Sequence, residues 1–138
     1  MSGSRLGVDA AQAVLADNFA PWIQALELRV EHVGEGDAVL RLPFSPSLCR
    51  VGGTICGQAL MAAADTAMVI AISAALGSFK PMTTVGQTIS FMRPIAGADT
   101  RVHAHVIKLG RTLAFGEIEM RSAGDALAAH GTTTYALL

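Results

Sequence analysis

Charged side chains are scarce in this sequence, since Asp, Glu, Lys and Arg together make up 15% of its 138 residues. The formal net charge of −1 shows none of the basic excess that binds nucleic acid or an anionic membrane surface. Hydrophobic residues reach 51%, which leaves apolar surface that a chain of this size has to cover. We therefore expect one domain, residues 1–138, that self-associates as a homodimer or a dimer of dimers.

Cysteine is also scarce. The two cysteines, Cys49 and Cys56, stand seven residues apart, which matches no standard zinc-binding spacing. The four histidines do not complete such a site in the sequence: His32, His103, His105 and His130. We expect no metal and, in a reducing cytoplasm, two free thiols.

One long apolar run dominates what is present, and a helix from Gly57 to Leu76 is its natural interpretation because alanine, leucine and methionine favour helices. Its length fits a membrane span of about 20 residues. Against a span stand Gln58, Asp65, the absence of a flanking Lys/Arg cluster, and strand-like segments on both sides. We therefore expect a buried core helix. Its single charge, Asp65, is costly there unless it is paired, hydrated or used.

The first 24 residues predict a helical lead-in. One face over residues 8–20 carries four apolar side chains: Val8, Ala11, Leu15 and Phe19. Pro21 is expected to stop or bend this helix. Asp9 and Asp17 interrupt the apolar stretches, which is not typical of a signal peptide, so we expect a cytoplasmic protein.

The remaining chain, residues 25–138, predicts strands and turns. Six segments show strand character: 26–31, 38–44, 83–92, 100–108, 113–120 and 126–137. Short glycine-bearing turns join the last four segments and indicate antiparallel neighbours. We expect an α+β fold in which an antiparallel sheet of about six strands curves around the one long central helix.

The helix entry carries the most specific pattern. Cys56-Gly57-Gln58, six intervening residues and Asp65-Thr66 correspond to a family pattern of His-Gly-Gly, the same spacing and an acidic residue. The segments 90–94 and 105–112 also correspond to family segments. On these residues the chain resembles the hotdog-fold thioesterases, in particular the acyl-CoA thioesterases of the phenylacetate-pathway type, from about residue 26 to 135.

The resemblance implies a hotdog fold and hydrolysis of an acyl-CoA or aryl-CoA thioester at a dimer interface. Asp65 would be the base or nucleophile, and the backbone N–H near Gly57 would polarise the carbonyl. No cofactor is implied beyond the coenzyme A of the substrate. The sequence departs from the family where Cys56 replaces the histidine and Gln58 the second glycine. The upstream asparagine has no clean counterpart, Cys49 or Arg50 being nearest.

Other residues near Asp65 have two interpretations each. Gln58 either orients water or the substrate carbonyl, or satisfies loop backbone. Cys56, at a helix N-terminus, is either a nucleophile or a packing residue with only a backbone role. The hydroxyl of Thr84 either helps to hold the water or simply fills a strand. Asp65 itself is either catalytic or a structural acid that caps a backbone group or pairs with Arg93 or Arg111.

A basic turn follows in the second half of the chain. The residues suited to coenzyme A phosphates are Lys108, Gly110, Arg111 and Thr112, with Arg93 expected in the same patch. The alternative is a solvated hairpin tip. His103, His105 and His130 are expected at a strand edge or an interface rather than in a metal site.

Two alternatives to hydrolysis remain open. The altered loop is compatible with a non-catalytic acyl-CoA-binding protein, but a binder has no need of a costly carboxylate in an apolar wall. A hotdog dehydratase ranks last, because the resemblance then requires a histidine that this loop lacks. The sequence does not identify the acyl group, because its methionine-rich surroundings adapt to several shapes.

Overall fold

The structure is a computed structural model that describes residues 6–138. The helices are α1 (Val8–Asn18), α2 (Pro21–Gln24) and α3 (Gly57–Leu76), with two short 3-10 turns at Pro46–Leu48 and Ala123–Asp125. The strands are β1 (Arg29–Gly34), β2 (Asp37–Leu42), β3 (Met82–Phe91), β4 (Thr100–Leu109), β5 (Leu113–Arg121) and β6 (Leu127–Leu137).

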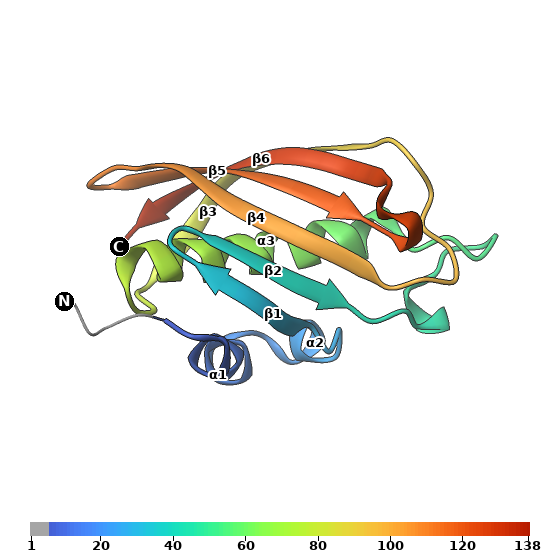
Figure 1. The fold of residues 1–138 in the computed structure, drawn as a ribbon, viewed down its shortest axis with the longest axis horizontal. Helices are drawn as coiled ribbons and strands as arrows, with labels where there is room; N and C mark the ends of the chain where they lie inside the picture. Colours follow the sequence, from blue (N-terminus) through green and yellow to red (C-terminus); the bar gives the residue numbers. More distant parts are fainter. Residues whose placement is uncertain (1–5) are drawn as a thin grey trace.

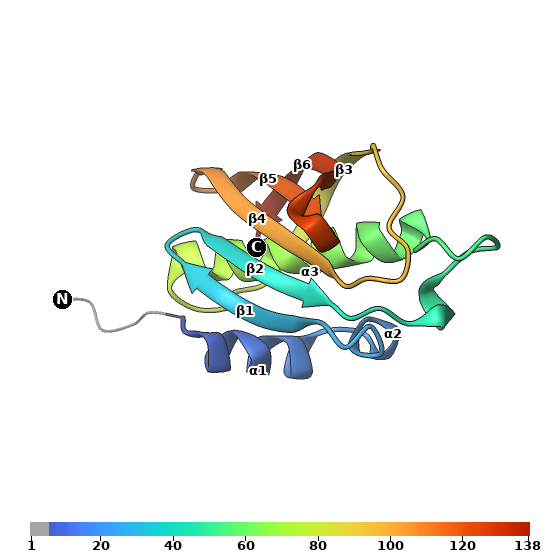
Figure 2. The ribbon, with the colours of Figure 1, turned by 45° about the vertical axis from the view of Figure 1, so that its right-hand side comes forward.

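The six strands form one antiparallel sheet in the order β1-β2-β4-β5-β6-β3. The sheet curves over α3, which runs along its inner face (Figure 1). Turned by 45°, the molecule shows α1 below β1, on the far side of the β1–β2 hairpin from the other strands (Figure 2). The expected α+β hotdog fold, with about six antiparallel strands around one long helix, is confirmed.

Small side chains let α3 lie close to the sheet. Ala63, Ala64 and Ala67 are fully buried, and Gly116 of β5 has no room for a Cβ because the Met68 side chain fills that space. Helix α3 has the length and composition of a membrane span, yet 61% of its most apolar window is buried inside the fold. The structure thus uses it as a core helix, as expected. Gly77 ends it with φ at 90°, a left-handed conformation that glycine adopts readily.

One edge of the sheet is covered and the other is not, within residues 6–138. Along β1, the side-chain amide of Gln12 donates to the Leu28 carbonyl at 3.0 Å and accepts from the Val30 N–H at 2.8 Å. One glutamine of α1 thereby replaces a neighbouring strand at that point. The outer edge of β3 has no covering element among residues 6–138, and Val85 on this strand is 62% exposed. A long unpaired edge is a surface to which another chain can add.

Most boundaries differ from the sequence-based expectation by one to three residues, and two of the differences have a local cause. The first strand begins at Arg29 rather than Leu26, because Glu27 takes a φ of 57°, which interrupts an extended chain. Leu26 and Leu28 are nevertheless buried, as their alternation predicts. The first helix ends at Asn18, and Pro21 opens α2 at its first position, where a missing N–H costs nothing.

Candidate active site

Asp65 lies in the middle of α3, half-buried, on the side of the helix that faces β3 and β6. The Thr84 hydroxyl donates to its Oδ1 at 2.8 Å. The Tyr135 hydroxyl donates to the same Oδ1 and also to the backbone carbonyl of Asp65, the latter at 2.7 Å. The carboxylate is therefore held through one of its two oxygens.

The sheet register explains why these hydroxyls converge. Thr84 of β3 and Tyr135 of β6 are direct cross-strand partners, so their side chains share one face of the sheet. That face looks onto α3. Tyr135 is only 1% exposed, and burial, followed by the neighbouring charge of Asp65, raises the pKa of its phenol well above the ordinary range. The phenol therefore stays protonated and donates to the carboxylate.

Asp65 forms no ion pair with any residue that the structure describes, so the alternative of a structural acid paired with Arg93 or Arg111 is not observed. Within residues 6–138, Oδ2 has no hydrogen-bond partner. A half-buried carboxylate with one oxygen fixed and the other free is suited to accept a proton from water or to attack a carbonyl.

At the entry to α3, the backbone N–H of Cys56 is not free for a ligand. Cys56 is the N-cap of α3, and its own N–H donates to the Leu48 carbonyl at 2.8 Å. That N–H is therefore occupied, and the donors that a ligand can reach begin with Gly57 at the first helical position. Gln58 is exposed in the first turn. Both cysteines are free thiols.

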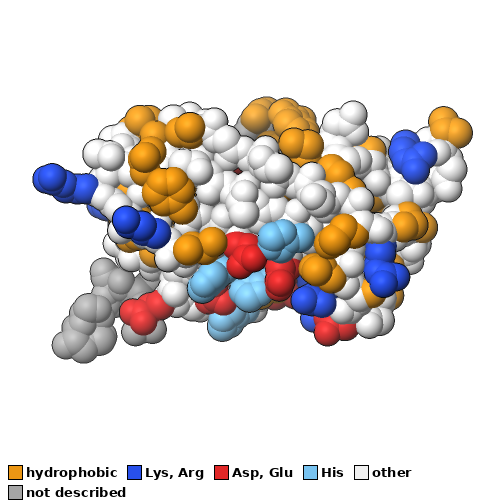
Figure 3. Space-filling model, turned by 90° about the horizontal axis from the view of Figure 1, so that it is seen from above, with side chains coloured by type: hydrophobic (Ala, Val, Ile, Leu, Met, Phe, Trp, Pro, Cys, Tyr) orange, Lys and Arg blue, Asp and Glu red, His pale blue; other side chains and the backbone are white. Residues whose placement is uncertain are grey.

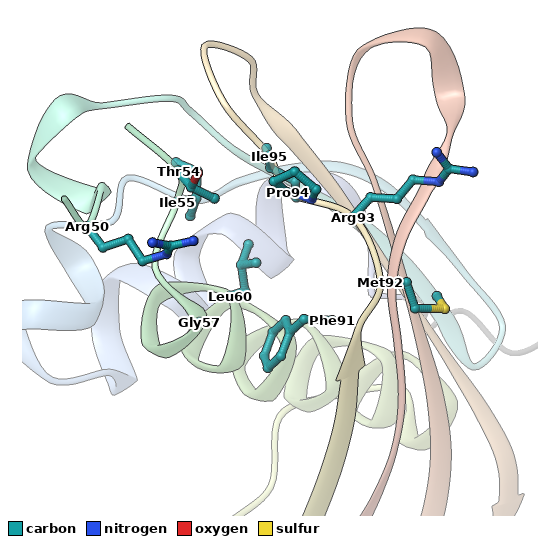
Figure 4. A pocket seen from close by; sticks show the side chains of 10 residues that line it. All are labelled: Arg50, Thr54, Ile55, Gly57, Leu60, Phe91, Met92, Arg93, Pro94 and Ile95. Carbon is teal, nitrogen blue, oxygen red and sulfur yellow. The ribbon is translucent and has the colours of Figure 1, made fainter. Parts of the chain in front are cut away.

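A pocket of about 440 Å³ opens beside this first turn (Figure 4). Its lining is mostly apolar, with two arginines: Arg50, Thr54, Ile55, Gly57, Leu60, Phe91, Met92, Arg93, Pro94 and Ile95. In Figure 4 Arg50 reaches toward the first turn of α3, whereas Arg93 extends away from it. Among the described residues, neither guanidinium forms an ion pair.

The basic residues predicted to bind coenzyme A do not form one patch within a single subunit. Arg93 lines the pocket at the N-terminal end of α3. The turn with Lys108, Gly110, Arg111 and Thr112 lies at the other end, where the Thr112 carbonyl accepts from the Leu137 N–H and the chain end meets Pro81. The long helix separates the two within one chain, so a shared patch stays a prediction that only an assembly of subunits could meet.

The histidines gather on the outer face of the sheet with acidic neighbours (Figure 3). His130 contacts Glu117 at 2.7 Å and His103 contacts Asp37 at 3.0 Å. His105 is paired with Glu117 across β4 and β5. Among residues 6–138 no group of three or more such side chains is arranged to hold a metal ion.

Comparison with known proteins decides the family. A sequence model described as the thioesterase superfamily matches residues 52–129, which include the whole of α3 and the strands β3, β4 and β5. The chain belongs to the thioesterase superfamily. The family and the fold together identify a hotdog-fold thioesterase, as the sequence resemblance implies.

Solved structures support the same family. A conserved protein from Pseudomonas aeruginosa is 32% identical, with a TM-score of 0.81 over 87% of this chain and 95% of its own. Zebra fish thioesterase superfamily member 2 is 25% identical, with a TM-score of 0.85 over 96% and 99% of the two chains. A mutant of the phenylacetic acid degradation protein PaaI from Thermus thermophilus is 29% identical, with a TM-score of 0.77 over 86% and 100%.

Sequence reasoning placed Asp65 and Thr84 in this thioesterase's candidate site, and the structure brings them together. It missed Tyr135, the one tyrosine of the chain. The one phenol of the chain, in a strand of mostly small residues, was the available signal, because a buried tyrosine hydroxyl needs a partner. The sequence presents Arg50 only as a neighbour of the missing asparagine. Its position in the pocket depends on the loop before α3.

Proposed function

We propose that this protein hydrolyses acyl-CoA or aryl-CoA thioesters, with Asp65 as base or nucleophile. The observation that carries the proposal is the carboxylate itself, held at Oδ1 by Thr84 and Tyr135 while Oδ2 is free of protein partners within the described chain. A non-catalytic binding protein has no use for such a half-buried, unpaired acid.

Two chemical routes fit this geometry. In the first, Oδ2 takes a proton from a water molecule as that water attacks the thioester carbonyl. In the second, Oδ2 attacks the carbonyl and forms an anhydride that water then hydrolyses. Both routes place negative charge on the carbonyl oxygen and release the thiolate of coenzyme A. A backbone N–H at the N-terminus of α3, that of Gly57, suits the developing oxyanion.

One subunit cannot supply both groups to the same thioester. Gly57 and Asp65 are eight residues apart in α3, which is about 12 Å along a helix. A reacting carbonyl has to lie about 3 Å from the oxyanion donor and within hydrogen-bond reach of the base or its water. The Asp65 of one subunit therefore acts with the partner's Gly57, and the site lies at a homodimer interface.

The open edge of β3 supports this assembly. Thr84, near the start of β3, holds Asp65, whereas Phe91, at its end, lies beside Gly57 with its ring 3.5 Å from where a Cβ would stand. A two-fold pairing of β3 with a second β3 is antiparallel. The start of one strand then meets the end of the other, which brings Asp65 of one subunit next to the partner's Gly57.

The same two-fold axis would position both the acyl group and the coenzyme A of the substrate. The apolar part of the pocket beside Gly57, with Ile55, Leu60 and Phe91, is suited to the acyl group. The turn around Arg111, at the C-terminal end of one α3, then lies on the same side as the N-terminal end of the other. Arg93 and that turn, apart within one chain, would both face the coenzyme A phosphates across the dimer.

Hydrolysis of a panel of aryl- and fatty acyl-CoA thioesters, followed by release of the free thiol, tests the proposal on the wild type and on Asp65→Asn. The asparagine keeps the shape and removes the base, so we expect a loss of about 100- to 10,000-fold in a protein that remains folded. Binding of acyl-CoA by the wild type without any thiol release would contradict hydrolysis and favour a binding protein.

A further inference from the structure

We propose that Tyr135 is a positioning residue for Asp65, which fixes the direction of its carboxylate. The kinetic consequence of this inference depends on the proposed hydrolysis. The contact itself can be measured without a substrate.

The contact restrains both the backbone and the side chain of Asp65. One phenol hydroxyl reaches the carbonyl oxygen of Asp65 at 2.7 Å and also its Oδ1. Tyr135 cannot follow if the carboxylate rotates, because its ring is 1% exposed and packed in the core beneath β6. Rotation of the carboxylate would therefore break a charge-assisted hydrogen bond, which is among the stronger kinds. Oδ1 is thereby held against the two hydroxyls, and Oδ2 has no hydrogen-bond partner among residues 6–138.

Few groups compete for this carboxylate. From β6 it meets the Tyr135 hydroxyl and from β3 the Thr84 hydroxyl, and neither carries a charge while the phenol remains protonated. Among residues 6–138 no arginine, lysine or histidine lies within ion-pair distance of Asp65. The two hydroxyls are thus the described groups that stabilise the anion, and Tyr135 is the more deeply buried of them.

A kinetic test uses Tyr135→Phe, which keeps the ring and removes the donor. We expect kcat to fall by about tenfold or more while KM changes little, since a hydrogen bond to a charged group is lost at the reacting residue.

Thr133→Val is the matched control. Thr133 lies two residues before Tyr135 on the same face of β6, is 3% exposed, and its hydroxyl has no hydrogen-bond partner within the described residues. Its loss removes a buried hydroxyl from the same strand without touching Asp65, so kcat and KM should both stay close to those of the wild type. If Tyr135→Phe keeps the kcat of the wild type, or raises KM as much as it lowers kcat, Tyr135 does not position the carboxylate and the inference is overturned.

A second measurement needs no activity. The chain contains one tyrosine, so the ultraviolet absorbance change of tyrosinate reports on Tyr135 alone. In the folded wild type this signal should appear well above the pH of an ordinary tyrosine. In Asp65→Asn it should appear at lower pH, since the repelling charge is gone while burial persists. Circular dichroism at each pH separates ionisation from unfolding.

The two measurements distinguish a failure of the proposed function from a failure of this inference. If no thioester is hydrolysed, the proposed function fails, and the tyrosinate titration still decides the contact. If hydrolysis is found but the folded wild type and Asp65→Asn give the same tyrosinate titration, Tyr135 does not contact the carboxylate and the inference is wrong.

Discussion

Thr84 and Tyr135 face each other across the β3–β6 pair, and both of their hydroxyls donate to the same oxygen of Asp65. The two residues are 51 positions apart in the sequence (135 − 84), so this site depends on the pairing of the last strand with the first strand after the helix. Within residues 6–138 the second carboxylate oxygen has no hydrogen-bond partner.

Thr84→Val should lower kcat/KM by about tenfold, because it removes one charge-assisted hydrogen bond and keeps the β-branched shape. Thr88→Val on the same strand is the control, since Thr88 is exposed and its cross-strand partner is Thr132 on the outer face. Thiol-release assays on both variants measure the effect. Equal activity in the two variants would show that the Thr84 hydroxyl does not serve Asp65.

Stability at alkaline pH should depend on Tyr135. Its pKa is raised in the folded state, whereas an unfolded tyrosine ionises near pH 10. Above about pH 10 the unfolded chain therefore binds fewer protons than the folded one. The free energy of unfolding then falls as pH rises, by about 1.4 kcal/mol per pH unit from this residue.

Urea denaturation at pH 9 and pH 11 measures this dependence. The wild type should lose about 1.4 kcal/mol more than Tyr135→Phe between the two values, since phenylalanine does not ionise. Other titrating groups are common to both proteins and cancel in the comparison. Identical losses would mean that the phenol ionises as readily in the folded protein as in the unfolded chain.

The covered edge of β1 predicts a specific stability effect. Gln12→Ala removes both hydrogen bonds that the amide makes to the strand backbone, and we expect a loss of about 1–2 kcal/mol in the free energy of unfolding. Asp17→Ala, at an exposed position of the same helix, should change stability by less than about 0.5 kcal/mol. Chemical denaturation that finds the two variants equally stable would contradict the role of Gln12.

Much of the fold could be predicted because its patterns are local. The helix from Gly57 to Leu76 follows from its composition and its glycine end, and the strands follow from alternation and turns. The first strand begins three residues later than alternation predicts, because Glu27 has a positive φ in the turn after α2, where its N–H donates to the Gln24 carbonyl. Alternation does not reveal this turn.

The site could be predicted only in part, because some of its contacts join residues that are far apart in the sequence. Asp65 stands out as the single charge of an apolar helix, and Thr84 follows from the family resemblance. Tyr135 joins them only through the non-local pairing of β3 with β6. The occupied N–H of Cys56 likewise depends on the Leu48 carbonyl, which a loop of irregular sequence brings to the helix entry.

Gly57 offers a direct test of the oxyanion donor. It is the first residue of α3, and Cys56 before it is extended with ψ at 150°, which is the conformation that a following proline requires. Gly57→Pro therefore removes the N–H with little cost to the helix, and we expect a loss of about 100- to 1,000-fold in kcat.

Gly57→Ala is its control, because it keeps the N–H and places a Cβ 3.5 Å from the Phe91 ring, an ordinary contact. This variant should remain within a few-fold of the wild type. If alanine and proline at this position reduce kcat equally, the reduction comes from the added side-chain atoms in the pocket and not from the lost N–H.

Complementation between two inactive variants tests most directly whether Asp65 acts with the partner's Gly57. Asp65→Asn and Gly57→Pro are denatured together in equal amounts, refolded and assayed beside each variant alone. In a random mixture half of the dimers are mixed, and each holds one intact site of two, so about one quarter of the wild-type activity should return. If Asp65 and Gly57 of the same subunit formed the site, the mixture would remain as inactive as its components, and the account would be wrong.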